Sequence, residues 1–157
     1  MRHDHHQAPA PPVIRAELQA SLLAPRQARA TVRQALSTWG LGALADDAEL
    51  LAGELVANAA EHADGTPIGL TICQHAEPGG RPGILCQITD SAPALPRPQP
   101  PQPDRERGRG LQIVAALSTD HGVMTSSQGK TAWFTLTAES GPAQAAQHAE
   151  PELEAGA

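Results

Sequence analysis

Three polar side chains recur every fourth residue inside the alanine-rich stretch ELVANAAEHA, at Glu54, Asn58 and His62. At about 100° per residue these positions stay on one flank of a helix, bordering its apolar sector. A carboxylate and an amide oxygen one turn apart could jointly hold Mg²⁺, which prefers oxygen ligands and keeps waters and phosphates as its other ligands. Glu54 could alternatively take a proton from a hydroxyl. A solvated helix flank has the same spacing and is common, so a flank, a buried polar network and a site all stay open.

Asp90 is the second candidate, because it ends the apolar run GILCQITD. A carboxylate held at a strand end beside a cleft can accept a hydrogen bond from an exocyclic amine, which makes a pocket selective for one base. The Ser-Ala-Pro that follows is equally consistent with ordinary turn chemistry. Both interpretations stay open for this residue.

A third candidate is the stretch ERGRGLQIV, in which Gly108 and Gly110 stand where a proline-rich segment meets an expected helix. Glycines there let backbone N–H groups approach a phosphate, and a helix start adds a favourable dipole. Arg105, Arg107 and Arg109 concentrate positive charge in an otherwise acidic chain. A lone GxG is a weak motif, and a solvated basic loop would have the same composition.

The tripeptide GKT at residues 129–131 matches the end of a P-loop signature. A P-loop would require glycine at the position of Met124 and a helix after the threonine, whereas TAWFTLTA alternates as a strand does. We therefore exclude a P-loop. Lys130 could still reach a phosphate as a point charge.

Charge and apolar content limit the partners of the chain. Eleven Lys and Arg against 17 Asp and Glu give a net charge of −6, which opposes attraction to a phosphate backbone, so we expect no nucleic-acid partner. No apolar run approaches the roughly 20 residues of a membrane-spanning helix, and the first residues lack the apolar stretch of a secretory signal. We expect a cytoplasmic protein with no membrane segment. Cys73 and Cys86 lack the spacing of a zinc site or a disulfide scaffold and are expected to be reduced thiols.

The elements that must position these residues follow from hydrophobic periodicity and from turn residues. The expected spans are a strand at 13–22, a helix at 24–39, a helix from 46 to about 63, strands at 68–76 and 83–90 joined as a hairpin, a proline-rich loop at 92–110, a helix at 110–122, and strands at 123–127 and 130–138. This order predicts an α+β two-layer sandwich with helices on one face of a mixed, mostly antiparallel sheet. The domain would span residues 13–138, between disordered tails at 1–12 and 139–157. His3, His5 and His6 lie in the first tail and are given no function.

Taken in chain order, these segments resemble the ATP-binding domain of the GHKL superfamily, which includes gyrase, Hsp90, histidine kinases and MutL. Within it the likeness is greatest to the small anti-sigma-factor serine kinases of actinobacteria, which often carry a stretch like ELVTNAVRHA. The resemblance covers about residues 15–138 and implies the Bergerat ATP-binding fold. The combination of segments is far more specific than any single one of them.

The resemblance also implies a ligand, ATP with Mg²⁺, and a role for each matching position. Asn58 would ligate the Mg²⁺ that bridges the ATP phosphates, Glu54 would be the general base, and Asp90 would bind the adenine amine. The remaining nucleotide-binding positions would be Arg105, Gly108, Arg109, Gly110 and Leu111 at the lid, with Lys130 and Thr131 completing the pocket. The superfamily pattern DxGxG is replaced here by Asp90-Ser-Ala-Pro-Ala, which supplies no glycine.

The function implied by the resemblance is that of a serine/threonine protein kinase acting on a small anti-sigma-factor antagonist, with or without binding of a sigma factor itself. The alternative is a non-catalytic ATP-binding module that regulates a partner by protein contact. The resemblance also leaves a homodimer open, with the first strand and first helix as its natural surface.

Overall fold

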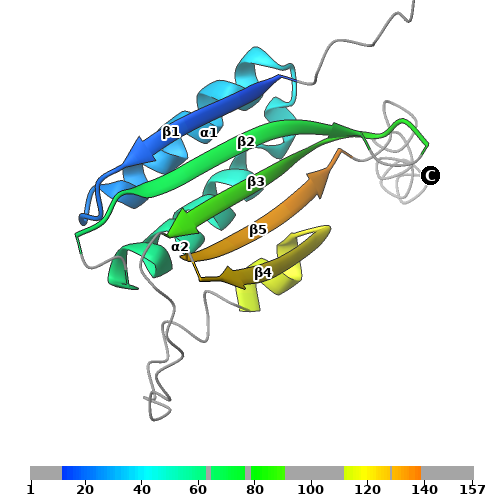
Figure 1. The fold of residues 1–157 in the computed structure, drawn as a ribbon. Coiled ribbons are helices and arrows are strands. Elements are labelled where there is room, and N and C mark those ends of the chain that lie inside the picture. The colour runs from blue at the N-terminus through cyan, green and yellow to red at the C-terminus, as the bar shows by residue number, and fades with distance from the viewer. Residues whose placement is uncertain (1–11, 63–64, 77–78, 91–111, 128, 139–157) are drawn as a thin grey trace, which may run out of the picture.

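A computed structural model describes residues 12–62, 65–76, 79–90, 112–127 and 129–138 of the 157-residue chain. Two helices lie behind one face of a five-stranded sheet (Figure 1). In chain order the elements are β1 (Val13–Leu18), α1 (Ala24–Thr38), η1 (Gly42–Leu44), α2 (Ala45–His62), β2 (Ile68–Ala76), β3 (Pro82–Asp90), β4 (Asp120–Ser126) and β5 (Gly129–Thr137). Residues 112–117 are also helical. The predicted α+β two-layer sandwich is confirmed.

The two long helices begin where the sequence signals predict. Pro25 lies in the first turn of α1, where a missing N–H costs no helical hydrogen bond. Gly40 follows that helix at φ 71°, a left-handed conformation that glycine adopts without strain. Asp46 and Asp47 lie in the first turn of α2, where carboxylates suit the positive end of the helix dipole. Among the described helices, none is both long enough and apolar enough to cross a membrane.

The strand order in the sheet is β1-β2-β3-β5-β4. Every neighbouring pair of described strands is antiparallel, so the sheet is more uniform than the mixed one that the sequence predicted. β3 is the central strand, with β2 on one side and β5 on the other. The β3–β5 pairing places Lys130 directly opposite Asp90, although the two are far apart in the sequence.

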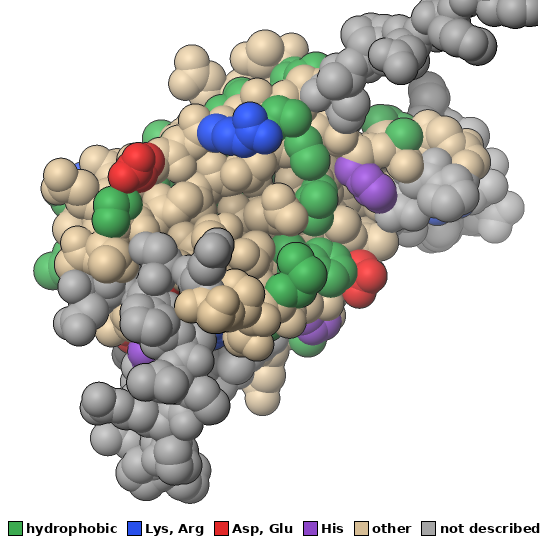
Figure 2. All heavy atoms as spheres, viewed as in Figure 1, with side chains coloured by type: hydrophobic (Ala, Val, Ile, Leu, Met, Phe, Trp, Pro, Cys, Tyr) green, Lys and Arg blue, Asp and Glu red, His purple; other side chains and the backbone are tan. Residues whose placement is uncertain are grey.

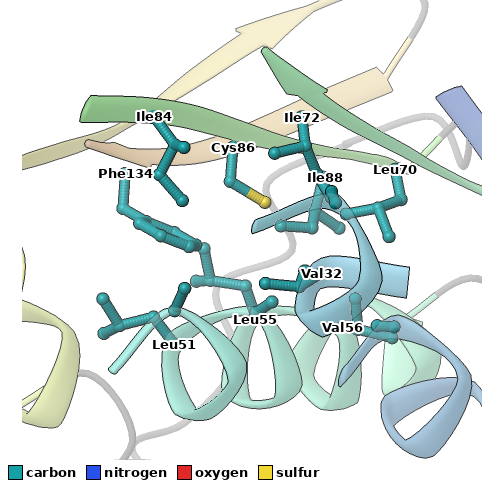
Figure 3. Packing of buried hydrophobic residues seen from close by; sticks show 14 of the residues in the cluster. Val32, Leu51, Leu55, Val56, Leu70, Ile72, Ile84, Cys86, Ile88 and Phe134 are labelled. Carbon is teal, nitrogen blue, oxygen red and sulfur yellow. The ribbon is translucent and has the colours of Figure 1, made fainter. Parts of the chain in front are cut away.

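The core lies between the sheet and the two helices. Successive strand residues point to opposite faces, and the helix-facing positions are the apolar ones. In Figure 3, Cys86 and Ile88 of β3 and Phe134 of β5 point toward Leu51 and Leu55 of α2. Phe134 is the one aromatic side chain in the buried core of the described residues. Apart from this one ring, the buried core is built from aliphatic residues, alanine and Cys86.

Two predicted boundaries were wrong. The helix expected at 110–122 is described only over 112–117, and β4 begins at Asp120 rather than at 123. The helix at 112–117 ends because the N–H of Thr119 donates to the carbonyl of Thr135 in β5, at 2.8 Å, rather than to a carbonyl one turn back. The first strand ends at Leu18, which pairs with the first residue of β2, rather than at 22. The predicted tails, apart from Pro12, and the proline-rich loop lie outside the described residues.

Candidate functional site

The flank of α2 that carries Glu54 and Asn58 lies at the edge of the core. Both side chains are partly exposed, while Leu55 and Val56 between them are buried. The flank is thus neither buried in the core nor fully exposed to solvent. His62, the third member of the series, is exposed in the last turn of the helix. The structure keeps Glu54 and Asn58 together one turn apart and leaves His62 at the helix end.

Asp90 continues the helix-facing row of β3 beyond Cys86 and Ile88. Only 6% of its surface is exposed, and it is the only buried carboxylate in the part of the chain that the structure describes. β3 packs against α2, so this carboxylate is held where the two layers meet. Asp and Glu are rarely buried unless they are paired or hydrogen-bonded, and Asp90 does interact with another group.

Lys130 and Thr131, which the sequence assigned to one pocket, lie on opposite faces of the sheet. Lys130 is paired with Asp90 in the β3–β5 ladder, and directly paired residues point to the same side. The hydroxyl of Thr131 lies 3.2 Å from that of Thr89, on the face turned away from the helices. The structure therefore places Lys130 on the same face as Asp90 and Thr131 on the opposite face. The physical reason is the two-residue period of a strand, which separates adjacent residues of the GKT tripeptide.

The predicted phosphate-contacting lid lies outside the described residues. It consists of Arg105, Gly108, Arg109, Gly110 and Leu111. Their assigned roles stay predictions. The helical residues 112–117 that follow the lid are described, and Val114 among them is 3% exposed within the core. The first described residues after the lid are therefore packed on the core.

Two arginines that the sequence analysis did not single out connect α1 to α2 beside the candidate site. Arg29 lies across Gly53, the residue before Glu54, and its Nη1 would be 3.0 Å from a Cβ placed there. Glu49, one turn earlier on α2, accepts a hydrogen bond of 2.9 Å from Nε of Arg33. A glycine in the middle of a predicted helix was the available signal, since it usually has a packing reason.

The residues present fit a magnesium-bound nucleotide in their donor chemistry. Among the described residues, no three His, Cys, Asp or Glu side chains gather as a self-contained metal site. Glu54 and Asn58 instead offer a carboxylate and an amide oxygen one turn apart, a set suited to Mg²⁺ that takes its other ligands from water and phosphate. The buried Asp90 is an acceptor-only group when ionised, as an amine donor requires.

Comparisons with known proteins place this arrangement in a family. No curated protein gave a significant match to the chain. A model of the histidine kinase-like ATPase domain matches residues 18–136, well over half of the chain, and spans all the elements from the end of β1 to β5. The chain therefore belongs to the histidine kinase-like ATPase domain family, and ATP is the nucleotide that a domain of this family binds.

Proposed function

We propose that this ATP-binding regulatory domain is a serine/threonine protein kinase of the anti-sigma-factor type. It transfers the γ-phosphoryl group of ATP to a hydroxyl of a small antagonist protein, and it also binds a sigma factor. Two observations support the proposal: Glu54 and Asn58 lie one turn apart and partly exposed on α2, and Asp90 is buried on the helix-facing side of β3. The partner class rests on the resemblance in sequence alone.

Each residue has a separate task in this proposal. Asp90 accepts a hydrogen bond from the adenine amine and so orients the base. Asn58 holds Mg²⁺, which when bound with the nucleotide neutralises charge on the transferred phosphoryl group. Glu54, partly exposed beside Asn58, accepts the proton of the attacking hydroxyl. Lys130, on the same side of the sheet as Asp90, supplies positive charge for the phosphates.

Phosphoryl transfer from labelled ATP to a candidate antagonist tests the role of Glu54. Glu54→Gln should lower the rate by about 10²- to 10⁴-fold, because a positioned base contributes on that scale, while ATP affinity changes little. Glu61→Gln is the matched control, since it makes the same change at an exposed position on the same helix. Its rate should stay close to that of the unaltered protein.

Binding of ATP, measured by calorimetry, tests the role of Asp90 separately. Asp90→Asn should weaken ATP roughly 10- to 100-fold, because a hydrogen bond to a charged group contributes about 1.5–3 kcal/mol. Asp47→Asn, an exposed carboxylate in the first turn of α2, should bind as the unaltered protein does.

The two experiments together separate the kinase from a binding module. Full transfer by Glu54→Gln would contradict its role as the base. Tight ATP binding without transfer to any cognate antagonist would replace the kinase proposal with a non-catalytic ATP-binding module that acts by protein contact. Unchanged ATP affinity in Asp90→Asn would remove the adenine contact from the proposal.

A further inference from the structure

β4 lies at one edge of the sheet, and that edge is open. In Figure 1 the strand forms one margin of the sheet, and β5 is its one neighbour among the described strands. An edge strand presents a row of unpaired N–H and C=O groups, which proteins usually protect with lysine, with other charged side chains or with proline. The opposite edge strand, β1, carries the exposed charges of Arg15 and Glu17, whereas β4 contains no Lys, Arg or Pro. Six of the seven residues of β4 are exposed, so the strand is accessible to a further strand.

Two adjacent residues in the middle of β4 are apolar and exposed on opposite faces of the sheet. Val123 is 55% exposed and pairs with Ala132, which packs against the core on the helix-facing side. Met124 is 58% exposed and pairs with Thr131 on the face turned away from the helices, which we call the outer face. A partner that docked on one face would cover only one of the two side chains. A strand added beside β4 has side chains on both faces at this level, so it would cover both.

An aromatic ring on the outer face reaches across β4. Trp133 of β5 lies over Gly122 of β4, so closely that a Cβ on the glycine would lie 2.8 Å from three atoms of the indole ring. Because Gly122 has no side chain, the ring extends from β5 over β4 toward the open edge, where it stays partly exposed. Figure 2 shows the outer face, on which apolar side chains gather and charged ones are few. A strand added beside β4 would therefore contact the indole ring of Trp133.

A carboxylate lies on the same face as the indole ring, at the start of β4. Asp120 is exposed, and it lies two residues before Gly122 and so on the same face. One of its oxygens accepts a hydrogen bond of 2.9 Å from the N–H of His121, which restrains the carboxylate. A cation that meets an aromatic ring and a carboxylate is attracted by both, and the net charge of −6 favours a cationic partner as well. The charges at this edge therefore fit Lys or Arg on the added strand.

We propose that β4 binds an extended segment of another protein as an added antiparallel strand, and that this segment has the order apolar, apolar, any, any, basic. The two apolar residues lie opposite Met124 and Val123, one on each face of the sheet. The basic residue lies opposite Asp120 on the outer face, where the ring of Trp133 also contacts it. Main-chain hydrogen bonds give such a complex its affinity, and the alternate side chains give it specificity. Binding at this edge is separate from phosphoryl transfer and does not depend on it.

A synthetic peptide, Thr-Thr-Val-Ile-Ser-Thr-Arg, tests the charge at this edge. It is blocked at both ends and has as many residues as β4, and calorimetry with the full chain measures its Kd. Asp120→Asn and Trp133→Thr should each raise the Kd roughly two- to fivefold, the weight of an exposed ion pair or cation–π contact. Glu17→Gln, which removes a carboxylate from the opposite edge strand, is the control and should leave the Kd unchanged. A second peptide with glutamate in place of arginine should bind Asp120→Arg more tightly than it binds the unaltered protein.

The two exposed apolar residues test whether the peptide binds along the edge or on one face. Val123→Ser and Met124→Ser should each raise the Kd about three- to tenfold, because an added strand buries both side chains. Leu22→Ser makes the same kind of change at a side chain that is 100% exposed before α1, and it should leave the Kd unchanged. Equal midpoints of urea unfolding would show that the variants are folded. A Kd that responds to only one of Val123→Ser and Met124→Ser would show docking on one face and would overturn the proposal.

Methylation of the peptide's backbone nitrogens tests the main-chain pairing. The N–H groups of a strand point alternately to its two sides, so methyl groups on one alternate set meet β4 and those on the other set face solvent. One methylated peptide should lose its binding and the other should keep it.

Three results would overturn the added strand. The first is an equal Kd for the two methylated peptides, and the second is no binding of the unmodified peptide at about 1 mM, well above the micromolar Kd expected. The third is a dimer of the free protein, seen by sedimentation, that Val123→Ser dissociates, because a second copy would then occupy the edge.

Discussion

At the scale of single residues, Gly83 shows how little space the central pairing of the sheet leaves. It is buried where β3 faces β5, and a Cβ on it would collide with the backbone carbonyl oxygen of Leu136. Because backbone cannot move aside as a flexible side chain can, Gly83→Ala should destabilise the protein by about 1–3 kcal/mol. Urea unfolding measures this difference. Gly42→Ala, with nothing within 4 Å of the new atom, is the control and should cost far less.

Cys86 makes a prediction for the alkaline side of the stability curve. Burial raises the pKa of its thiol well above the ordinary 9.0, and the neighbouring Cys73 adds to the rise. The folded state therefore keeps the proton that the unfolded state loses, so this contribution is complete below about pH 9 and is lost as the pH rises above it. The free energy of unfolding should fall by up to about 1.4 kcal/mol per pH unit from this group.

Urea titrations between pH 8 and 10.5 would show the effect without interference from tyrosine, which the chain lacks. Cys86→Ala should flatten the fall. Cys73→Ala is the comparison, because its thiol is only partly buried, and it should leave the fall steep. Equal slopes for the two variants would contradict burial of Cys86 as the cause.

At the scale of elements, Arg33 connects α1 to α2 on the solvent-exposed side of the helix pair. Its guanidinium hydrogen-bonds to Glu49, which raises the pKa of Arg33 above its ordinary value, and it also lies 3.5 Å from Asp46. Because an arginine stays protonated at any pH where the protein is studied, this contact contributes equally across the neutral range. A double-mutant cycle of Arg33→Ala with Glu49→Ala should give a favourable coupling that shrinks in 1 M salt. Coupling that does not respond to salt would contradict an ionic contact.

Most elements could be predicted because their patterns are local. The apolar alternation of β2 and β3 and the periodicity of α1 and α2 follow from which residues face the core. The start of β4 could not be predicted in this way, since its first residues Asp-His-Gly have no strand pattern. They are extended because they pair with β5, a long-range contact that local sequence does not record.

In the candidate site too, local patterns could be predicted from the sequence and long-range pairings could not. The spacing of Glu54 and Asn58 within one helix fixed their common flank, and the apolar run ahead of Asp90 indicated a strand end. That Asp90 and Lys130 lie opposite each other depends on strand order, which only the fold supplies. Thr131 shows the converse. It is next to Lys130 in the sequence, which suggested a shared pocket, but adjacent strand residues point to opposite faces of the sheet.

At the scale of the whole molecule, ATP should stabilise the fold by mass action. At one hundred times its dissociation constant, a ligand of the native state adds about 2.7 kcal/mol, which corresponds to a rise in Tm of roughly 5–10 °C for a domain of this size. EDTA should reduce this rise in Tm for the unaltered protein. For Asn58→Ala the rise should be the same with and without EDTA. Scanning calorimetry checks both. An unchanged shift in EDTA would contradict a role for Mg²⁺, and no shift at all would contradict ATP binding at this site.

The order of the strands also sets an order of folding. β2 with β3, and β4 with β5, are neighbours both in the chain and in the sheet, so each pair can form early as a hairpin. Joining β5 to the central strand must close a much longer loop, and β1 pairs with β2 across the segment that holds both helices. Until the hairpin of β4 and β5 docks, one edge of β3 is open to other chains, so aggregation during refolding should increase when that docking is slowed.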